Sequence, residues 1–131
     1  MRREDIGPRY FGERLGYEHA VLLERPERWL LIAGHESRAD DGSIAHRGDL
    51  RAQLELTFQR IRETSAEAGF TLADVVQLRI HAIDIRAVTA NYDVITGILA
   101  AHDCRPTSTL IQVAALSDPD MLVEIEGIAA R

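Results

Sequence analysis

The spacing of apolar residues along the chain predicts two amphipathic helices. In residues 49–68 the apolar positions recur at intervals of four, four and three, so they share one face of a helix. In residues 87–102 the apolar positions again share one side. The two sets are Leu50, Leu54, Phe58 and Ile61, and then Val88, Tyr92, Ile95 and Leu99. Gly69 stands where a C-cap glycine would end the first helix, and Pro106 follows the second.

Shorter patterns predict strands. Residues 76–82 alternate apolar with polar side chains, which is the period of a strand with one buried face. Residues 109–114 and 122–129 predict two further strands, joined by a turn at residues 117–120.

Nearer the N-terminus, two apolar runs flank a polar stretch that contains a proline. The runs are residues 20–23 and 29–33, and we expect them to pair as a hairpin. The order of elements makes the chain an α+β protein with a mixed sheet. Two helices of this length cannot cover both faces of such a sheet, so we expect them together on one face. The other face then needs a partner, and self-association in a ring is the simplest way to cover it.

The composition is that of one globular domain over residues 1–131. Hydrophobic residues make up 46% and charged residues 27%, which are ordinary values for a soluble protein. No apolar run approaches the roughly 20 residues of a membrane helix, and no signal-peptide pattern opens the chain. We therefore expect a cytoplasmic protein with no membrane partner.

Charge and cysteine content narrow the chemistry. The net charge of −6 disfavours nucleic acid as a partner, because binders of polyanions need a basic surface. All fifteen positive charges are arginine, which excludes a Schiff base on a lysine side chain. Cys104 is the single cysteine, and we expect it to be an unreactive residue near a helix end.

The C-terminal strand carries the first candidate chemistry. Glu124 and Glu126 are two positions apart, so both project from the face that carries Leu122 and Ile128. A carboxyl group held among apolar neighbours at a subunit boundary has a raised pKa, which suits a proton shuttle near neutral pH. The alternative is an exposed edge strand that paired glutamates protect from aggregation.

Arg79 and His81 form a second candidate pair. They share one face of residues 76–82 and would supply an anion contact and a proton donor to one site, or else play structural roles. The five histidines show neither the i, i+4 pairing nor the cysteine partners of a zinc site. We therefore expect no metal and no organic cofactor.

Several segments resemble one known family. Residues 105–116, 118–119 and 123–129 resemble the C-terminal signature of RidA proteins, also called YjgF or endoribonuclease L-PSP proteins. Earlier matches occur in the same order as in that family, namely Gly16–Tyr17, Ala33–Gly34, Asp49, Gln53, residues 68–76 and Asp84. The resemblance covers residues 16–129.

This resemblance implies a chorismate-mutase-like fold that forms a homotrimer with clefts between subunits. Deaminase members of the family hydrolyse reactive enamines and imines such as 2-aminoacrylate. In them a glutamate positions the attacking water and an arginine clamps the substrate carboxylate. The glutamate corresponds to Glu124 and a tyrosine near the cleft to Tyr17, and Gly34 joins the expected substrate-binding residues.

The clamp arginine has no match in this chain. Its position, two residues after the proline, is occupied by Ser108, and Arg105 precedes the proline instead. A serine hydroxyl gives a neutral hydrogen bond, about half as strong as a charge-assisted one, and it cannot grip both carboxylate oxygens. Thr89 likewise replaces an asparagine of the family. These departures leave room for a substrate other than 2-aminoacrylate.

The sequence thus favours a RidA-like enamine or imine deaminase, or a related hydrolase of a small reactive metabolite. Glu124 would orient the water, Tyr17 would close the pocket, and Arg105 or Arg79 would meet the anionic end of the substrate. The alternative is a trimer that binds a small metabolite without catalysis. Ribonuclease activity rests only on the historical family name, and the acidic composition disfavours it.

Overall fold

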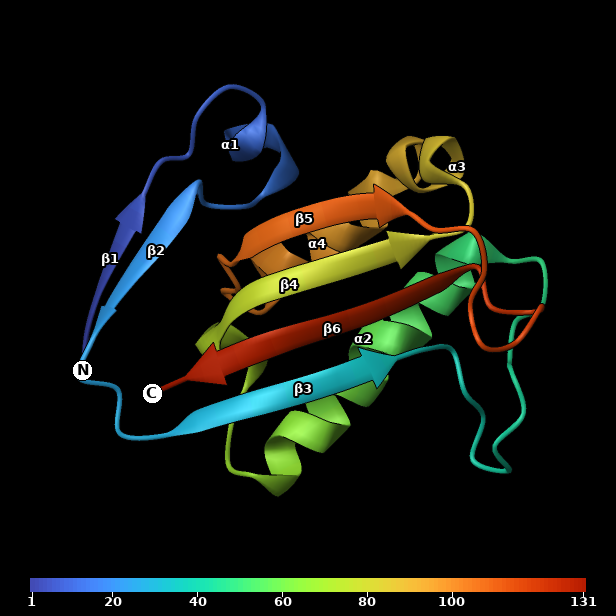
Figure 1. The fold of residues 1–131 in the computed structure, drawn as a ribbon, viewed down its shortest axis with the longest axis horizontal. Helices are drawn as coiled ribbons and strands as arrows, with labels where there is room; N and C mark the ends of the chain where they lie inside the picture. Colours follow the sequence, from blue (N-terminus) through green and yellow to red (C-terminus); the bar gives the residue numbers. More distant parts are fainter.

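A four-stranded mixed sheet forms the centre of the computed structural model, which describes residues 1–131 (Figure 1). Its strand order is β3-β6-β4-β5. The strands are β3 (Trp29–His35), β4 (Val75–Ala82), β5 (Thr107–Gln112) and β6 (Val123–Ala130). β6 runs antiparallel to both β3 and β4, whereas β4 and β5 are parallel. The predicted mixed sheet and the three predicted strands from residue 76 onward are confirmed.

Two helices cover one face of this sheet. α2 (Leu50–Glu67) and α4 (Tyr92–Ala101) lie behind the strands in Figure 1. The Asp49 carboxylate caps α2 by accepting a hydrogen bond from the Ala52 amide at 3.1 Å. The apolar stripes of both helices pack against alternate residues of β4 and β6 in one core. The prediction that both helices lie on one face is therefore confirmed.

The second helix begins earlier than the spacing predicts and is broken. α3 (Ile85–Ala90) precedes α4, and Asn91 separates them with φ −112° and ψ 17°. The Asp84 carboxylate caps α3 by accepting hydrogen bonds from two backbone amides. The Asn91 side-chain amide donates to the Ala87 carbonyl at 2.8 Å, and this competition with the backbone ends the first segment. A single helix over residues 87–102 was therefore a wrong prediction.

The predicted hairpin between residues 20–23 and 29–33 is also wrong. β2 (Ala20–Glu24) pairs antiparallel with β1 (Arg2–Ile6), and β3 pairs with β6. The backbone amides of Glu27 and Arg28 both donate to the Arg131 carbonyl at 2.9 Å. The connection is therefore tied to the C-terminus instead of closing a tight turn between β2 and β3.

Two short elements complete the chain. α1 (Gly12–Leu15) lies between β1 and β2, and a 3-10 turn, η1 (Leu72–Asp74), leads into β4. The Glu18 amide, just after α1, donates to the Pro106 carbonyl at 2.8 Å, which ties the N-terminal segment to the start of β5. None of the helices combines the length and the hydrophobicity that a membrane span requires.

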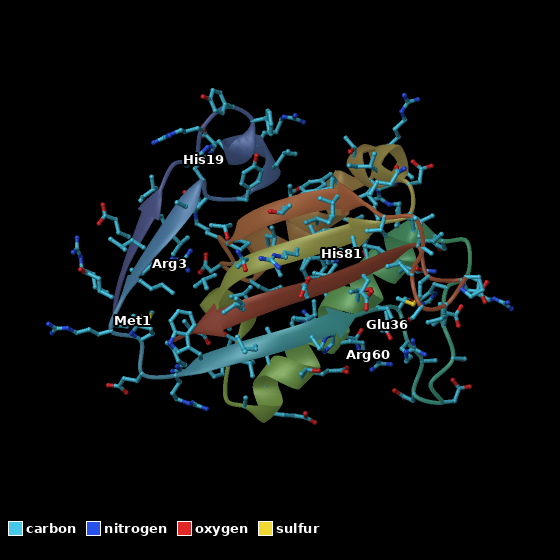
Figure 2. The ribbon with its side chains drawn as sticks, viewed as in Figure 1. Met1, Arg3, His19, Glu36, Arg60 and His81 are labelled. Atoms are coloured by element: carbon cyan, nitrogen blue, oxygen red, sulfur yellow. The ribbon has the colours of Figure 1, made fainter.

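The face of the sheet opposite the helices is uncovered in the subunit. Figure 2 shows His81 on this face. Large apolar side chains on the same face remain exposed, including Trp29 at 55% and Leu31 at 76%. The expectation that the helices leave one sheet face without cover is thus met.

Candidate functional site

A cavity of about 560 Å³ lies between α1, the α3–α4 segment and the helix-side face of β5. Its lining residues are Phe11, Arg14, Leu15, Tyr17, Thr89, Ala90, Tyr92, Asp93, Thr96, Ser108 and Leu110. Tyr17 and Ser108 are two of the residues predicted from the sequence, and they come from opposite ends of the chain. The fold brings them together because the segment after α1 is tied to the start of β5.

Tyr92 lies beside both of these residues. Burial raises the pKa of the Tyr92 phenol, and the neighbouring Ser108 hydroxyl opposes that shift only in part. The nearby Tyr17 acts in the same direction as burial on this pKa. The Tyr92 phenol therefore stays protonated at neutral pH, and the cavity offers neutral hydroxyl groups for hydrogen bonding to a ligand.

The charged residues of the cavity are Arg14 and Asp93. The Asp93 carboxylate accepts two hydrogen bonds from the Arg51 guanidinium, at 2.9 and 2.8 Å, which lower the pKa of Asp93. Arg14 takes part in none of the ion pairs of the structure. Our reading of the sequence missed Arg14, although its place three residues before Tyr17 puts both on one short turn.

A second group of predicted residues lies on the uncovered sheet face. A β-bulge between Ile32 and His35 places Gly34 under the Glu124 side chain. A Cβ added at Gly34 would lie 2.8 Å from the Glu124 carboxyl carbon, so any larger residue there would force the Glu124 side chain to shift. Gly34 and Glu124 are thus in direct contact.

His81 and Arg79 extend this second group along β4. His81 Nδ1–H donates to the Glu124 carbonyl oxygen at 3.3 Å, and Nε2 lies 3.5 Å from Glu126 Oε1. Arg79 stands directly opposite Glu126 in the antiparallel pairing of β4 and β6. We name Gly34, Arg79, His81, Glu124 and Glu126 the carboxylate cluster.

Arg105 belongs to neither group. Its Nε donates to Glu18 Oε1 at 2.7 Å, and its Nη2 bonds the same oxygen. Glu18 is only 2% exposed, so the arginine compensates a buried negative charge. Arg105 does not line the cavity, nor does Arg79. The two arginines expected to hold the substrate anion therefore lie elsewhere in the isolated subunit.

Apart from Arg105, the predicted site residues fall into two separate places within one chain. Tyr17 and Ser108 line the cavity on the helix side of β5, whereas none of the carboxylate cluster does. The cavity holds no carboxylate other than Asp93, which Arg51 neutralises. The carboxylate cluster lies on the uncovered sheet face, where Arg79 and Glu126 line a small hollow of about 80 Å³.

A mixed sheet with two helices on one face and a bare opposite face makes this an α+β protein, and the same fold occurs in solved structures of the Rid family. The family model described as Endoribonuclease L-PSP matches residues 12–131, and the chain belongs to this family. The match confirms the resemblance that residues 16–129 indicate.

Solved structures agree with this assignment. The Rid-family protein YyfB of Yersinia pestis is 30% identical, with a TM-score of 0.87 over 100% of both chains. Rv2704 of Mycobacterium tuberculosis, of the YjgF/YER057c/UK114 family, is 30% identical, with a TM-score of 0.65 over 99% of this chain and 100% of its own.

TdcF of E. coli, solved with bound serine, is 24% identical, with a TM-score of 0.72 over 96% of this chain and 90% of its own. A comparison with curated protein sequences finds no match.

Proposed function

We propose that this protein hydrolyses small enamines or imines at sites completed between copies of the chain. The separation of the predicted residues carries this proposal. The cavity has room for a small ligand but no free carboxylate, whereas the carboxylate cluster has glutamates but only a hollow of about 80 Å³ beside Arg79 and Glu126. A neighbouring subunit that brings its carboxylate cluster to the mouth of the cavity would complete one site.

The uncovered sheet face supports an assembly of this kind. This face is apolar because it exposes Trp29, Leu31 and Ile111. Exposure of such a surface to water is unfavourable, and contact with another copy of the chain would remove it from water. Cyclic symmetry makes every interface of a ring the same, so a trimer would hold three equivalent sites. A solution mass of about three times the 14.6 kDa subunit is expected, and a mass of one subunit would contradict the assembly.

The proposed reaction needs only water and proton transfer. An enamine tautomerises to its imine, water adds to the carbon of the C=N bond, and that bond then breaks to release ammonia and leave a carbonyl product. Glu124 would accept a hydrogen bond from the water and later carry its proton to the leaving nitrogen. Tyr17 would close the cavity over the substrate, and the hydroxyl of Ser108 would hydrogen-bond to it.

The fold is suited to small polar ligands. TdcF, which has the same fold, was solved with bound serine. The 2-amino acid skeleton of serine has the polar groups of a 2-aminoacrylate-type substrate, which makes this compound a reasonable first assay.

The test is release of ammonia from 2-aminoacrylate generated in a coupled assay. Glu124→Gln keeps the shape of the side chain and removes the base, so turnover should fall about 10²–10⁴-fold. Glu67→Gln is the matched control, because it removes the same charge from an exposed position on α2 away from the cavity and the carboxylate cluster, and it should leave turnover unchanged. Equal rates for the wild type and Glu124→Gln would reject hydrolysis of this substrate.

A further inference from the structure

We propose that Arg14 binds the anionic group of the substrate, and that the cavity takes a monocarboxylate with an apolar or aromatic body. The inference rests on the proposed function, because it concerns the same site. It assigns to Arg14 a role that Arg105 cannot fill because Glu18 holds it, and that Arg79 of the same chain cannot fill because it does not line the cavity.

The charges around the cavity favour Arg14 as the residue that binds the anionic group. It is the single positively charged side chain that lines the cavity. Arg51, which approaches from α2, is held by both oxygens of Asp93, and Arg105 is held by the buried Glu18. Arg14 alone keeps its guanidinium available, and a guanidinium binds a carboxylate through two parallel hydrogen bonds.

The local fold holds Arg14 at the cavity. Leu15, the next residue, packs against the core and so anchors α1 on the α4 side of the molecule. Gly16 ends α1 in a left-handed conformation with φ 77°, and the Tyr17 amide donates back to the Gly12 carbonyl at 3.2 Å. Arg14 and Tyr17 are therefore presented to the cavity by one anchored turn, one as a charge and the other as an aromatic wall.

The size and lining of the cavity indicate the rest of the ligand. Its volume of about 560 Å³ lies within the ~300–1,000 Å³ range of pockets that enclose drug-sized ligands, and a three-carbon acid would leave most of it empty. Phe11, Leu15 and Leu110 provide apolar walls. A ligand with one carboxylate and an apolar body would pair with Arg14 and fill the remaining space.

Calorimetric titration of the full chain tests this inference with three probes. They are 3-phenylpropanoate, its neutral amide 3-phenylpropanamide, and propanoate, which keeps the charge without the ring. Wild-type protein should bind 3-phenylpropanoate more tightly than either of the others. Arg14→Gln should weaken 3-phenylpropanoate binding about 10–100-fold, the effect of losing a charged hydrogen-bond pair, and leave the amide unchanged.

Two further variants separate binding from folding. Arg9→Gln removes an exposed arginine of the same segment that does not line the cavity, so it should bind all three probes as the wild type does. Arg14→Lys keeps the charge and should recover part of the lost affinity. A thermal unfolding midpoint for Arg14→Gln within the range of these controls establishes that its fold is intact.

Equal affinity of wild type and Arg14→Gln for 3-phenylpropanoate would overturn the role of Arg14. If propanoate binds as tightly as 3-phenylpropanoate, the claim that the ligand has an apolar body is wrong. If neither acid binds, the whole inference is wrong. The hydrolysis proposal is decided separately, by the rates of Glu124→Gln and wild type. Binding that depends on Arg14, together with no turnover, would keep the anion site and reject hydrolysis of 2-aminoacrylate.

Discussion

The two faces of the β3-β6-β4-β5 sheet differ in what covers them and in what they carry. On the helix side, Leu78, Ile80 and Ile125 are fully buried beneath α2 and α4. On the other side, the same strands present Arg79, His81 and Glu124 to the surface, with no helix over them. Because successive residues of a strand point to opposite faces, β6 supplies the core with one set of positions and the carboxylate cluster with the other. One face stabilises the fold, and the other is the face on which we propose assembly and chemistry.

The largest effect should come from a truncation on the covered face. Phe58 of α2 is 1% exposed within the core cluster, so Phe58→Ala should lower the free energy of unfolding by about 3–5 kcal/mol. Leu31→Ala removes an exposed side chain from the uncovered face and should change it by less than about 0.5 kcal/mol at protein concentrations low enough to dissociate the proposed trimer. Urea unfolding of both variants measures the difference. Similar losses would contradict the division between the two faces.

A smaller effect, on turnover, is expected when a side chain fills the space beneath Glu124. Gly34→Ala puts a methyl group where the Glu124 carboxylate lies, and a displacement of the order of 1 Å should lower kcat/KM about 10–100-fold. Gly97→Ala is the control, because a Cβ there meets no atom within 4 Å and alanine favours the helix. Unchanged turnover in Gly34→Ala would show that the position of Glu124 is unimportant for catalysis.

The smallest expected effect is a change in the free energy of unfolding at high pH, caused by the buried Cys104 thiol. Burial raises the pKa of the Cys104 thiol from its ordinary value of 9.0 to about 12. Above about pH 9 the unfolded chain loses this proton while the folded protein keeps it, so the free energy of unfolding falls as pH rises toward 12. In Cys104→Ala this part of the pH dependence should be absent. Denaturant unfolding of both proteins across that pH range measures it, and identical slopes would contradict burial of the thiol.

Much of the fold could be predicted from periodicity because the core imposes it. The alternation of residues 76–82 and the apolar stripe of α2 are direct consequences of one buried face, and both are present in the structure. Strand pairing at the N-terminus could not be predicted in this way. Residues 20–23 have the pattern of a strand, but nothing in that pattern distinguishes β1 from β3 as the neighbour. The break at Asn91 depends on a side-chain contact that apolar spacing does not report.

The candidate site could be predicted only in pieces. The family resemblance indicated Tyr17, Ser108, Gly34 and Glu124, and the structure pairs Tyr17 with Ser108 and Gly34 with Glu124. The sequence could not predict the direction of the Arg105 side chain, because its buried partner, Glu18, is distant along the chain. Whether the two pairs form one site depends on contacts between subunits, and these stay a prediction.

Co-expression of two inactive subunits tests the central claim most directly. Tyr17→Ala should disable the cavity half of a site, and Glu124→Gln should disable the carboxylate half. In a mixed trimer, a cavity from a Glu124→Gln subunit can meet an intact carboxylate cluster from a Tyr17→Ala subunit. If each site takes one half from each of two neighbours, an equal mixture should recover ~25% of wild-type turnover, because random assembly makes that fraction of sites intact. Turnover no higher than that of either variant alone would contradict a site shared between subunits.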